Sequence, residues 1–177
     1  MYSFIKNYFL QQYIKTTQKP RKREVHSLFT AHSIGYLWVA DSKSAWEQML
    51  NMQNKLTVSR TRLQALAYIP GKIMPEYFRP HPNIIVFQDK DINFFGKIRL
   101  PEVKHFMEEP FDLLIDFSTS YLPAFYGVAS LSCAHFIAGG EDMHASAYDL
   151  LMKNEKKVPE ILFEQIKLYT SKLIGSV

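Results

Sequence analysis

The segment Ile34-Gly-Tyr-Leu-Trp-Val-Ala40, followed directly by Asp41-Ser-Lys-Ser44, decides the fold class. Its first part is a nearly continuous apolar run with β-branched and aromatic members, which is typical of a strand buried on both faces. Its second part offers side chains that cap helix N-termini, and apolar residues at helical spacing follow it over 45–52. The segment therefore predicts a strand followed by a helix, the first half of a β–α–β unit.

The rest of the chain repeats this alternation. Apolar runs predict further strands at 63–69, 84–87, 112–117, 135–138 and 147–152, and helical spacing predicts helices over 119–132 and from Pro159 onward. Short strands that alternate with helices indicate a parallel sheet with right-handed crossovers. We therefore expect an α/β domain, Rossmann-like or flavodoxin-like, with a mostly parallel sheet of five to six strands and helices on both faces.

A separate amphipathic helix is predicted at residues 3–16, where aromatic and apolar side chains recur at spacings of three and four. The residues of this expected aromatic face are Phe4, Ile5, Tyr8, Phe9 and Tyr13. Pro20 discourages any continuation of the helix. We therefore divide the chain into a basic helix and hinge at 1–24 and a single α/β domain at 25–177.

The net charge of +4 is concentrated at the N-terminus. Within residues 1–24, the only acidic residue is Glu24, and the basic residues are Lys6, Lys15, Lys19, Arg21, Lys22 and Arg23. The remainder of the chain is close to neutral. A cationic N-terminal segment on a neutral domain favours binding to an acidic partner such as RNA, or to an anionic membrane surface.

The amino-acid composition also indicates the cellular compartment in which we expect the protein. Cys133 is the one cysteine, so the chain can form no internal disulfide and no four-cysteine zinc site. No segment approaches the ~20 apolar residues of a spanning helix. We expect a cytoplasmic protein.

Several segments carry a family resemblance. The pieces are Ser33-Ile-Gly35, Ile73-Met-Pro-Glu-Tyr-Phe78, Asp91-Ile-Asn-Phe-Phe-Gly-Lys97, Glu109-Pro-Phe-Asp-Leu-Leu-Ile-Asp-Phe-Ser118, Ala129-Ser-Leu-Ser-Cys-Ala-His-Phe136 and Tyr148-Asp-Leu-Leu151. With these pieces the chain resembles a bacterial family of unknown function, small proteins with a basic N-terminal helix and a Rossmann-like body. The resemblance implies the fold and brings no activity with it.

Polar side chains follow two of the predicted strands and form a candidate cleft. Asp41 and Ser42 follow the first strand, Asp116 lies near the end of the strand at 112–117, and Ser118 follows that strand. If these strands are neighbours, the four side chains converge where doubly wound sheets bind ligands. The alternative is structural: Asp41 and Ser118 as helix caps, and Asp116 as a hydrogen-bond acceptor at the end of the sheet.

The sequence predicts no metal site, no cofactor and no catalytic residue. The glycines of a phosphate-binding loop are absent. A zinc or iron site needs at least three converging ligands, and the histidines are scattered along the chain: His26, His32, His81, His105, His135 and His144.

The segment Asn93-Phe-Phe-Gly96 places two adjacent aromatic residues in a predicted loop. Both cannot face the same interior, so one could pack on the core while the other lies at a contact surface. Anchoring of the loop on the core is the interpretation that we favour.

The leading hypothesis is a non-catalytic binding protein whose basic N-terminus contacts RNA or a ribonucleoprotein such as the ribosome. The residues expected to make this contact are Lys15, Lys19, Arg21, Lys22 and Arg23. One alternative is an enzyme or small-molecule-binding protein that uses the candidate cleft. Another is peripheral membrane attachment through residues 1–23. The aromatic face of the helix could also simply pack against its own domain.

Overall fold

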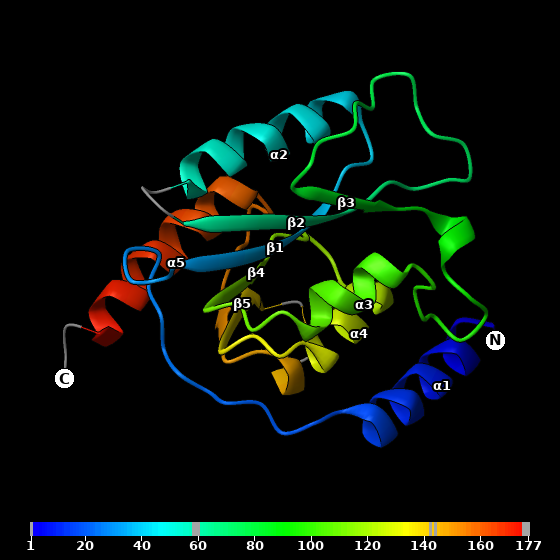
Figure 1. Ribbon diagram of the computed structural model, residues 1–177, viewed down its shortest axis with the longest axis horizontal. Coiled ribbons are helices and arrows are strands. Elements are labelled where there is room, and N and C mark those ends of the chain that lie inside the picture. The colour runs from blue at the N-terminus through cyan, green and yellow to red at the C-terminus, as the bar shows by residue number, and fades with distance from the viewer. Residues whose placement is uncertain (1, 58–60, 142, 144, 175–177) are drawn as a thin grey trace.

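A six-stranded sheet in which every strand is parallel forms the centre of the protein (Figure 1). The computed structural model describes residues 2–57, 61–141, 143 and 145–174. The strands are β1 (Ser33–Val39), β2 (Arg62–Tyr68), β3 (Ile84–Phe87), β4 (Leu113–Asp116), β5 (Phe136–Gly140) and β6 (Leu150–Met152). The predicted α/β class and the parallel sheet are confirmed.

Five α-helices and two short 3₁₀ helices connect and flank the strands in the described part of the chain. They are α1 (Tyr2–Thr17), α2 (Lys43–Leu56), η1 (Asp89–Asp91), α3 (Pro101–Glu108), α4 (Pro123–Leu131), η2 (Ala145–Ala147) and α5 (Pro159–Ile174).

The strand order is β3-β2-β1-β4-β5-β6. The chain therefore starts its sheet in the middle, winds outward through β2 and β3, and returns to the other side of β1 with β4. In the register of this central pair, Leu37 of β1 lies opposite Asp116 of β4. The point at which strand order reverses lies between β1 and β4, as the candidate cleft required.

Helices cover both faces of the sheet, with an apolar core on each. On one face α2 and α5 pack against alternate residues of β1 such as Tyr36 and Trp38. On the other face α1, α3 and α4 pack against Leu37 and its neighbours. Alternation of side chains along each strand explains why every central strand must be apolar on both sides.

The N-terminal helix packs on its own domain. Leu10 and Ile14 of α1 are buried in the apolar core that also includes residues of α3 and α4. A Cβ atom at Gly127 of α4 would come within 3.3 Å of the Leu10 side chain, so the glycine at this position permits the close approach of the two helices. Figure 1 shows α1 below α3 and α4, with the chain then running along the base of the molecule to β1.

The structure corrects the expected buried face of this helix. Tyr8 and Phe9 are 55% and 41% exposed, whereas Leu10 and Ile14 are buried. Tyr13 packs partly against the core. Phe4 and Ile5 lie in α1, but their side chains lie outside the described residues. The aromatic spacing predicted the helix correctly and its contact face wrongly, because the short aliphatic residues fit closer to α4 than rings do.

Two further differences concern connections. The helix α3 was not predicted, and it begins with Pro101 at its first turn, a position where proline costs no hydrogen bond. The last predicted strand, 147–152, is shorter in the structure, because η2 occupies 145–147 and β6 begins at Leu150.

Among the described residues, none of the helices has both the length and the apolar character needed to span a bilayer.

We expect Leu10→Ala to lower the free energy of unfolding by about 2–5 kcal/mol, because it removes a buried side chain and leaves a cavity between α1 and α4. Urea denaturation measures this loss. The exposed neighbour Gln12 provides the control, since Gln12→Ala should change stability by no more than about 0.5 kcal/mol. Equal effects of the two substitutions would mean that α1 does not pack on the domain.

Candidate functional site

A groove of about 930 Å³ lies between the end of α1, the loop that follows η1, and α3. Its floor is apolar and includes Tyr13, Leu100, Met107 and Leu131. Four exposed cations line it: Lys19, Lys97, Arg99 and Lys104. We call this depression the basic groove. Lys104 is 3.8 Å from Glu108, the one acidic residue among its described lining residues.

The loop beside the basic groove is held in a fixed shape by Asn93. Its side-chain oxygen accepts hydrogen bonds from the backbone N–H groups of Phe95 and Lys97, both at 2.9 Å. Gly96 completes the turn with a φ of +79°, which favours glycine. Ile92 and Ile98 form a β-bridge that closes the base of the loop. The turn therefore presents its two phenylalanines outward.

Four exposed aromatic rings gather where this loop meets α1, and we call them the aromatic cluster: Tyr8, Phe9, Phe94 and Phe95. They are between 41% and 55% exposed. The Phe9 and Phe95 rings are 5.1 Å apart and meet edge to face, which joins the helix to the loop. Anchoring of the loop on the core by these phenylalanines, the interpretation favoured above, is therefore wrong: both rings are exposed, and Phe95 packs on another exposed ring.

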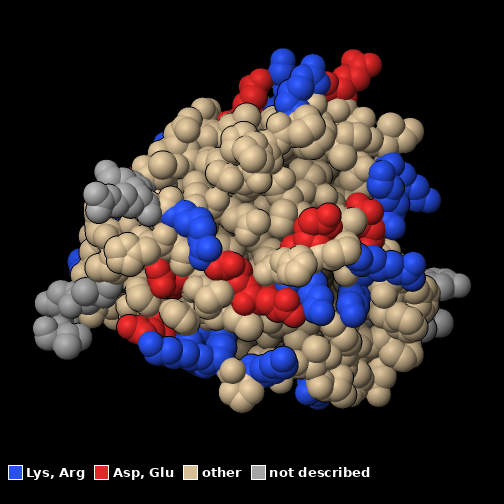
Figure 2. Space-filling model, viewed as in Figure 1, with Lys and Arg blue, Asp and Glu red and all other residues tan. Residues whose placement is uncertain are grey.

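The aromatic cluster and the basic groove are continuous. A second, shallower depression of about 420 Å³ is lined by Phe9 and Phe95, and it shares Tyr13, Asn93 and Lys97 with the basic groove. The ammonium group of Lys97 lies 4.6 Å from the centre of the Tyr13 ring. Rings and cations thus form one surface. In Figure 2, Lys and Arg side chains extend over the lower half of the molecule, with acidic side chains between them.

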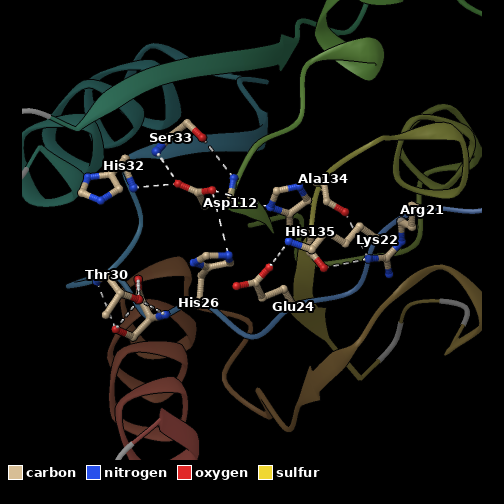
Figure 3. Close-up of polar contacts among 11 residues, drawn as sticks. Arg21, Lys22, Glu24, His26, Thr30, His32, Ser33, Asp112, Ala134 and His135 are labelled. Carbon is tan, nitrogen blue, oxygen red and sulfur yellow. Dashed lines mark hydrogen bonds and ion pairs between the residues drawn. The ribbon is translucent and has the colours of Figure 1, made fainter.

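Among the basic residues predicted to contact RNA, Arg21 instead makes hydrogen bonds within the protein. Its guanidinium group donates to the carbonyl oxygens of Ala134 and His135 at 3.1 and 3.0 Å (Figure 3). It also donates to the carboxylate of Asp149 at 2.6 Å. The Arg21 side chain is only 10% exposed. It cannot approach an external phosphate without breaking these bonds.

The other four predicted cations are more open. Lys15 and Lys19 are exposed, and Lys19 lines the basic groove. Lys22 is 71% exposed and pairs with Glu24 at 2.5 Å. Arg23 is 65% exposed, with its Nε atom 3.5 Å from Asp149. Exposed pairs of this kind are weak, so these side chains remain available to an external anion.

Sequence reasoning missed Lys97, Arg99 and Lys104 as partners of the N-terminal cations. They lie about eighty residues from Lys19 along the chain, in a segment with no net basic run. The available signal was the pair of adjacent phenylalanines at 94–95, which indicated a contact surface next to Lys97.

The candidate cleft residues behave differently from one another. Asp116 is fully buried: Ser118 donates to its Oδ1 atom through backbone N–H and hydroxyl, and Tyr148 donates to Oδ2 at 2.6 Å. Burial raises the pKa of Asp116 above its ordinary value, although these hydrogen bonds oppose the shift. Burial, together with the nearby Asp116, likewise raises the pKa of Tyr148. Both oxygens of Asp116 are thus engaged within the protein.

Asp41 and Ser42 lie at the exposed end of β1. Ser42 caps α2 by accepting from the backbone N–H of Ala45 at 3.1 Å, so Ser42 and not Asp41 is the cap. Ser118 does not cap α4, whose N-cap residue is Leu122. A small pocket at this edge is lined by Ser118, Glu141 and Asn154 among others, and Asp41, Ser42 and Asp116 are not among its described lining residues.

The buried Asp116 gives a testable pH dependence. Because its pKa is higher in the folded chain than the ordinary value of 3.8, its stabilising contribution is complete below that value and is lost as pH rises through the folded pKa. The wild type should therefore lose stability relative to Asp116→Asn as pH rises from about 4 to about 8. Urea denaturation of both chains across this range measures the difference. A constant difference, or one that grows in favour of the wild type, would contradict the raised pKa.

Comparison with known proteins identifies the family of this chain. The model of a family of unknown function (DUF6913) matches residues 6–173, which is nearly the whole chain. No curated protein and no solved structure matches it. The matched region includes most of α1, the aromatic cluster, the basic groove and all six strands. The chain therefore belongs to this family of unknown function, DUF6913.

Proposed function

We propose that this protein binds single-stranded RNA, alone or within a ribonucleoprotein, and that it works by binding and not by catalysis. The observation that carries the proposal is the continuity of the aromatic cluster with the basic groove. Proteins that bind single strands combine a cationic groove, which follows the phosphates, with aromatic side chains on which bases stack. This surface offers both elements side by side.

The arrangement favours a single strand over a duplex. In a duplex the bases are stacked inside the helix and cannot reach aromatic side chains, whereas single-stranded bases can be splayed onto them. The four rings of the aromatic cluster project at the rim, between 41% and 55% exposed, and the cations line the adjoining depression. A strand that lies along the groove could therefore place bases on the rings and phosphates beside Lys97 and Arg99.

The proposal modifies the contact residues expected from the sequence. Lys15, Lys19, Lys22 and Arg23 remain candidate contacts because they are exposed, and Arg21 becomes a structural residue. Lys97, Arg99 and Lys104 join the set. As part of the same proposal, the protein acts in a bacterial cytoplasm, where RNA and ribosomes are abundant.

The test is fluorescence anisotropy of a labelled single-stranded oligoribonucleotide, titrated with the full chain at several salt concentrations. Binding should weaken steeply with salt, because each phosphate contact releases a counterion. The combined substitution Lys97→Ala, Arg99→Ala and Lys104→Ala should weaken binding and reduce the slope of log K against log salt by about 0.7 for each cation removed.

A matched control removes three exposed lysines outside the groove, Lys55, Lys72 and Lys156. This control changes net charge equally and should retain both the affinity and most of the salt slope. Equal losses in the two triple variants would reject the groove as the RNA site. Uptake of the chain by anionic vesicles, with no binding of the oligonucleotide, would reject RNA and support membrane attachment instead.

A further inference from the structure

Four polar side chains meet at the amino-terminal edge of the sheet (Figure 3). Glu24 and His26 belong to the linker between α1 and β1, Asp112 directly precedes β4, and His135 directly precedes β5. Because β4 and β5 are parallel neighbours, the residues before them lie side by side, and the linker passes beneath both.

Three of these residues offer ligand atoms to a common point. One carboxylate oxygen of Glu24 and one nitrogen each of His26 and His135 all lie within 4.8 Å of one another. The two imidazole rings stack, with centres 5.8 Å apart and planes inclined by 27°. Ligand atoms around a tetrahedral zinc ion lie about 3.4 Å apart, given zinc–ligand distances of about 2.0–2.2 Å. Small side-chain rotations that move each ligand atom by about 1 Å would bring the three atoms to this separation of about 3.4 Å.

Asp112 lies beside the two rings, on a third side of the cluster. Its Oδ2 atom accepts from the backbone N–H groups of His32 and Ser33 at 2.8 and 3.1 Å, which fixes the carboxylate. Its Oδ1 atom faces His26 Nε2 at 4.0 Å and His135 Nδ1 at 3.6 Å. Although burial opposes the shift, the hydrogen bonds from His32 and Ser33, with the nearby His26, lower the pKa of Asp112.

The two nitrogens that face Asp112 are buried, and neither makes a hydrogen bond with the described residues. Buried polar atoms without partners are uncommon, and each requires an explanation. Here two of them converge on one fixed carboxylate oxygen. A carboxylate that accepts an imidazole N–H fixes the tautomer of the ring and leaves its second nitrogen as a metal ligand.

We propose that Glu24, His26 and His135 bind one Zn²⁺ ion, with Asp112 as the residue that orients both imidazoles. Two imidazole nitrogens and a carboxylate oxygen are donors that zinc accepts readily. Since Glu24 and His26 come from the linker and His135 from the start of β5, the ion joins the linker to the sheet. The site lies next to Arg21, whose guanidinium group binds the carbonyl oxygens of Ala134 and His135.

No local sequence pattern indicates this site. The three ligands are separated by one residue in the first segment and by more than a hundred residues thereafter, and they follow no zinc-binding spacing. Only the parallel pairing of β4 with β5 and the path of the linker bring them together.

The experiment uses the full chain without a histidine tag, stripped of metal with a chelator and titrated with Zn²⁺ by isothermal calorimetry. We expect one equivalent to bind and to raise the melting temperature, because a ligand of the native state stabilises it. His26→Gln and His135→Gln should each weaken Zn²⁺ binding by at least about 10-fold. His105→Gln, at a residue whose side chain is 80% exposed on α3, should bind as the wild type does.

Cobalt gives a second measurement on the unaltered chain, independent of whether the glutamine variants fold. Co²⁺ bound at this site should show the visible absorption of four-coordinate nitrogen and oxygen ligation, and Zn²⁺ should displace it. Absence of stoichiometric Zn²⁺ binding by the wild type would overturn the proposal. Loss of Zn²⁺ binding in His105→Gln equal to that in His26→Gln would overturn it as well.

Discussion

The placement of residues 2–30 depends on the ion pair between Arg21 and Asp149. The two side chains are only 10% and 9% exposed, and Asp149 also accepts from the backbone N–H of Ile137 in β5 at 2.9 Å. A buried charge that loses its partner costs about 3–5 kcal/mol, so the pair resists separation. It ties the linker to the carboxylate that precedes β6, on the side of the sheet formed by β4, β5 and β6.

This ion pair explains why α1 lies against the α/β domain and shares a continuous surface with it. Once Arg21 is fixed, the few residues between it and the end of α1 cannot carry the helix far from α4, where Leu10 and Ile14 are buried. The end of the helix then forms one wall of the basic groove, and Phe9 contacts Phe95 of the loop. The division of the chain at residue 24 therefore describes its charge distribution better than its packing. Within the basic segment at 15–23, Arg21 holds the linker on the domain, whereas Lys19 lines the basic groove.

The sequence predicted the strands and their parallel orientation well, because strands such as 34–40 must be apolar on both faces when helices cover both sides of the sheet. It left the strand order open, and the structure shows that β1 and β4, the strands of the two sets of candidate residues, are paired. It could not reveal that Asp116 is buried with Tyr148, which lies thirty-two residues further along the chain. It also could not distinguish exposed from buried aromatic residues in α1. Helical spacing identifies a face, but the residues of α4 decide which face is used.

The same limit applies to both proposed sites. Lys19 and Lys97 meet only because the loop after η1 runs beside α1, and His26 and His135 meet only because the linker crosses the amino-terminal edge of the sheet. Pairs so distant in sequence carry no local pattern. The cationic N-terminus predicts a contact with an acidic partner, and the fold places Lys97 and Arg99 in the same depression as Lys19.

NMR can map the proposed RNA-binding surface directly. In ¹⁵N-labelled full-length protein, addition of a single-stranded oligoribonucleotide should shift the amide signals of residues 8–19 and 93–104, the segments that form the aromatic cluster and the basic groove. Shifts confined to residues 118–119, 140–141 and 154–157, at the carboxyl ends of β4, β5 and β6, would contradict the account. They would point to the small pocket at that edge as the binding site.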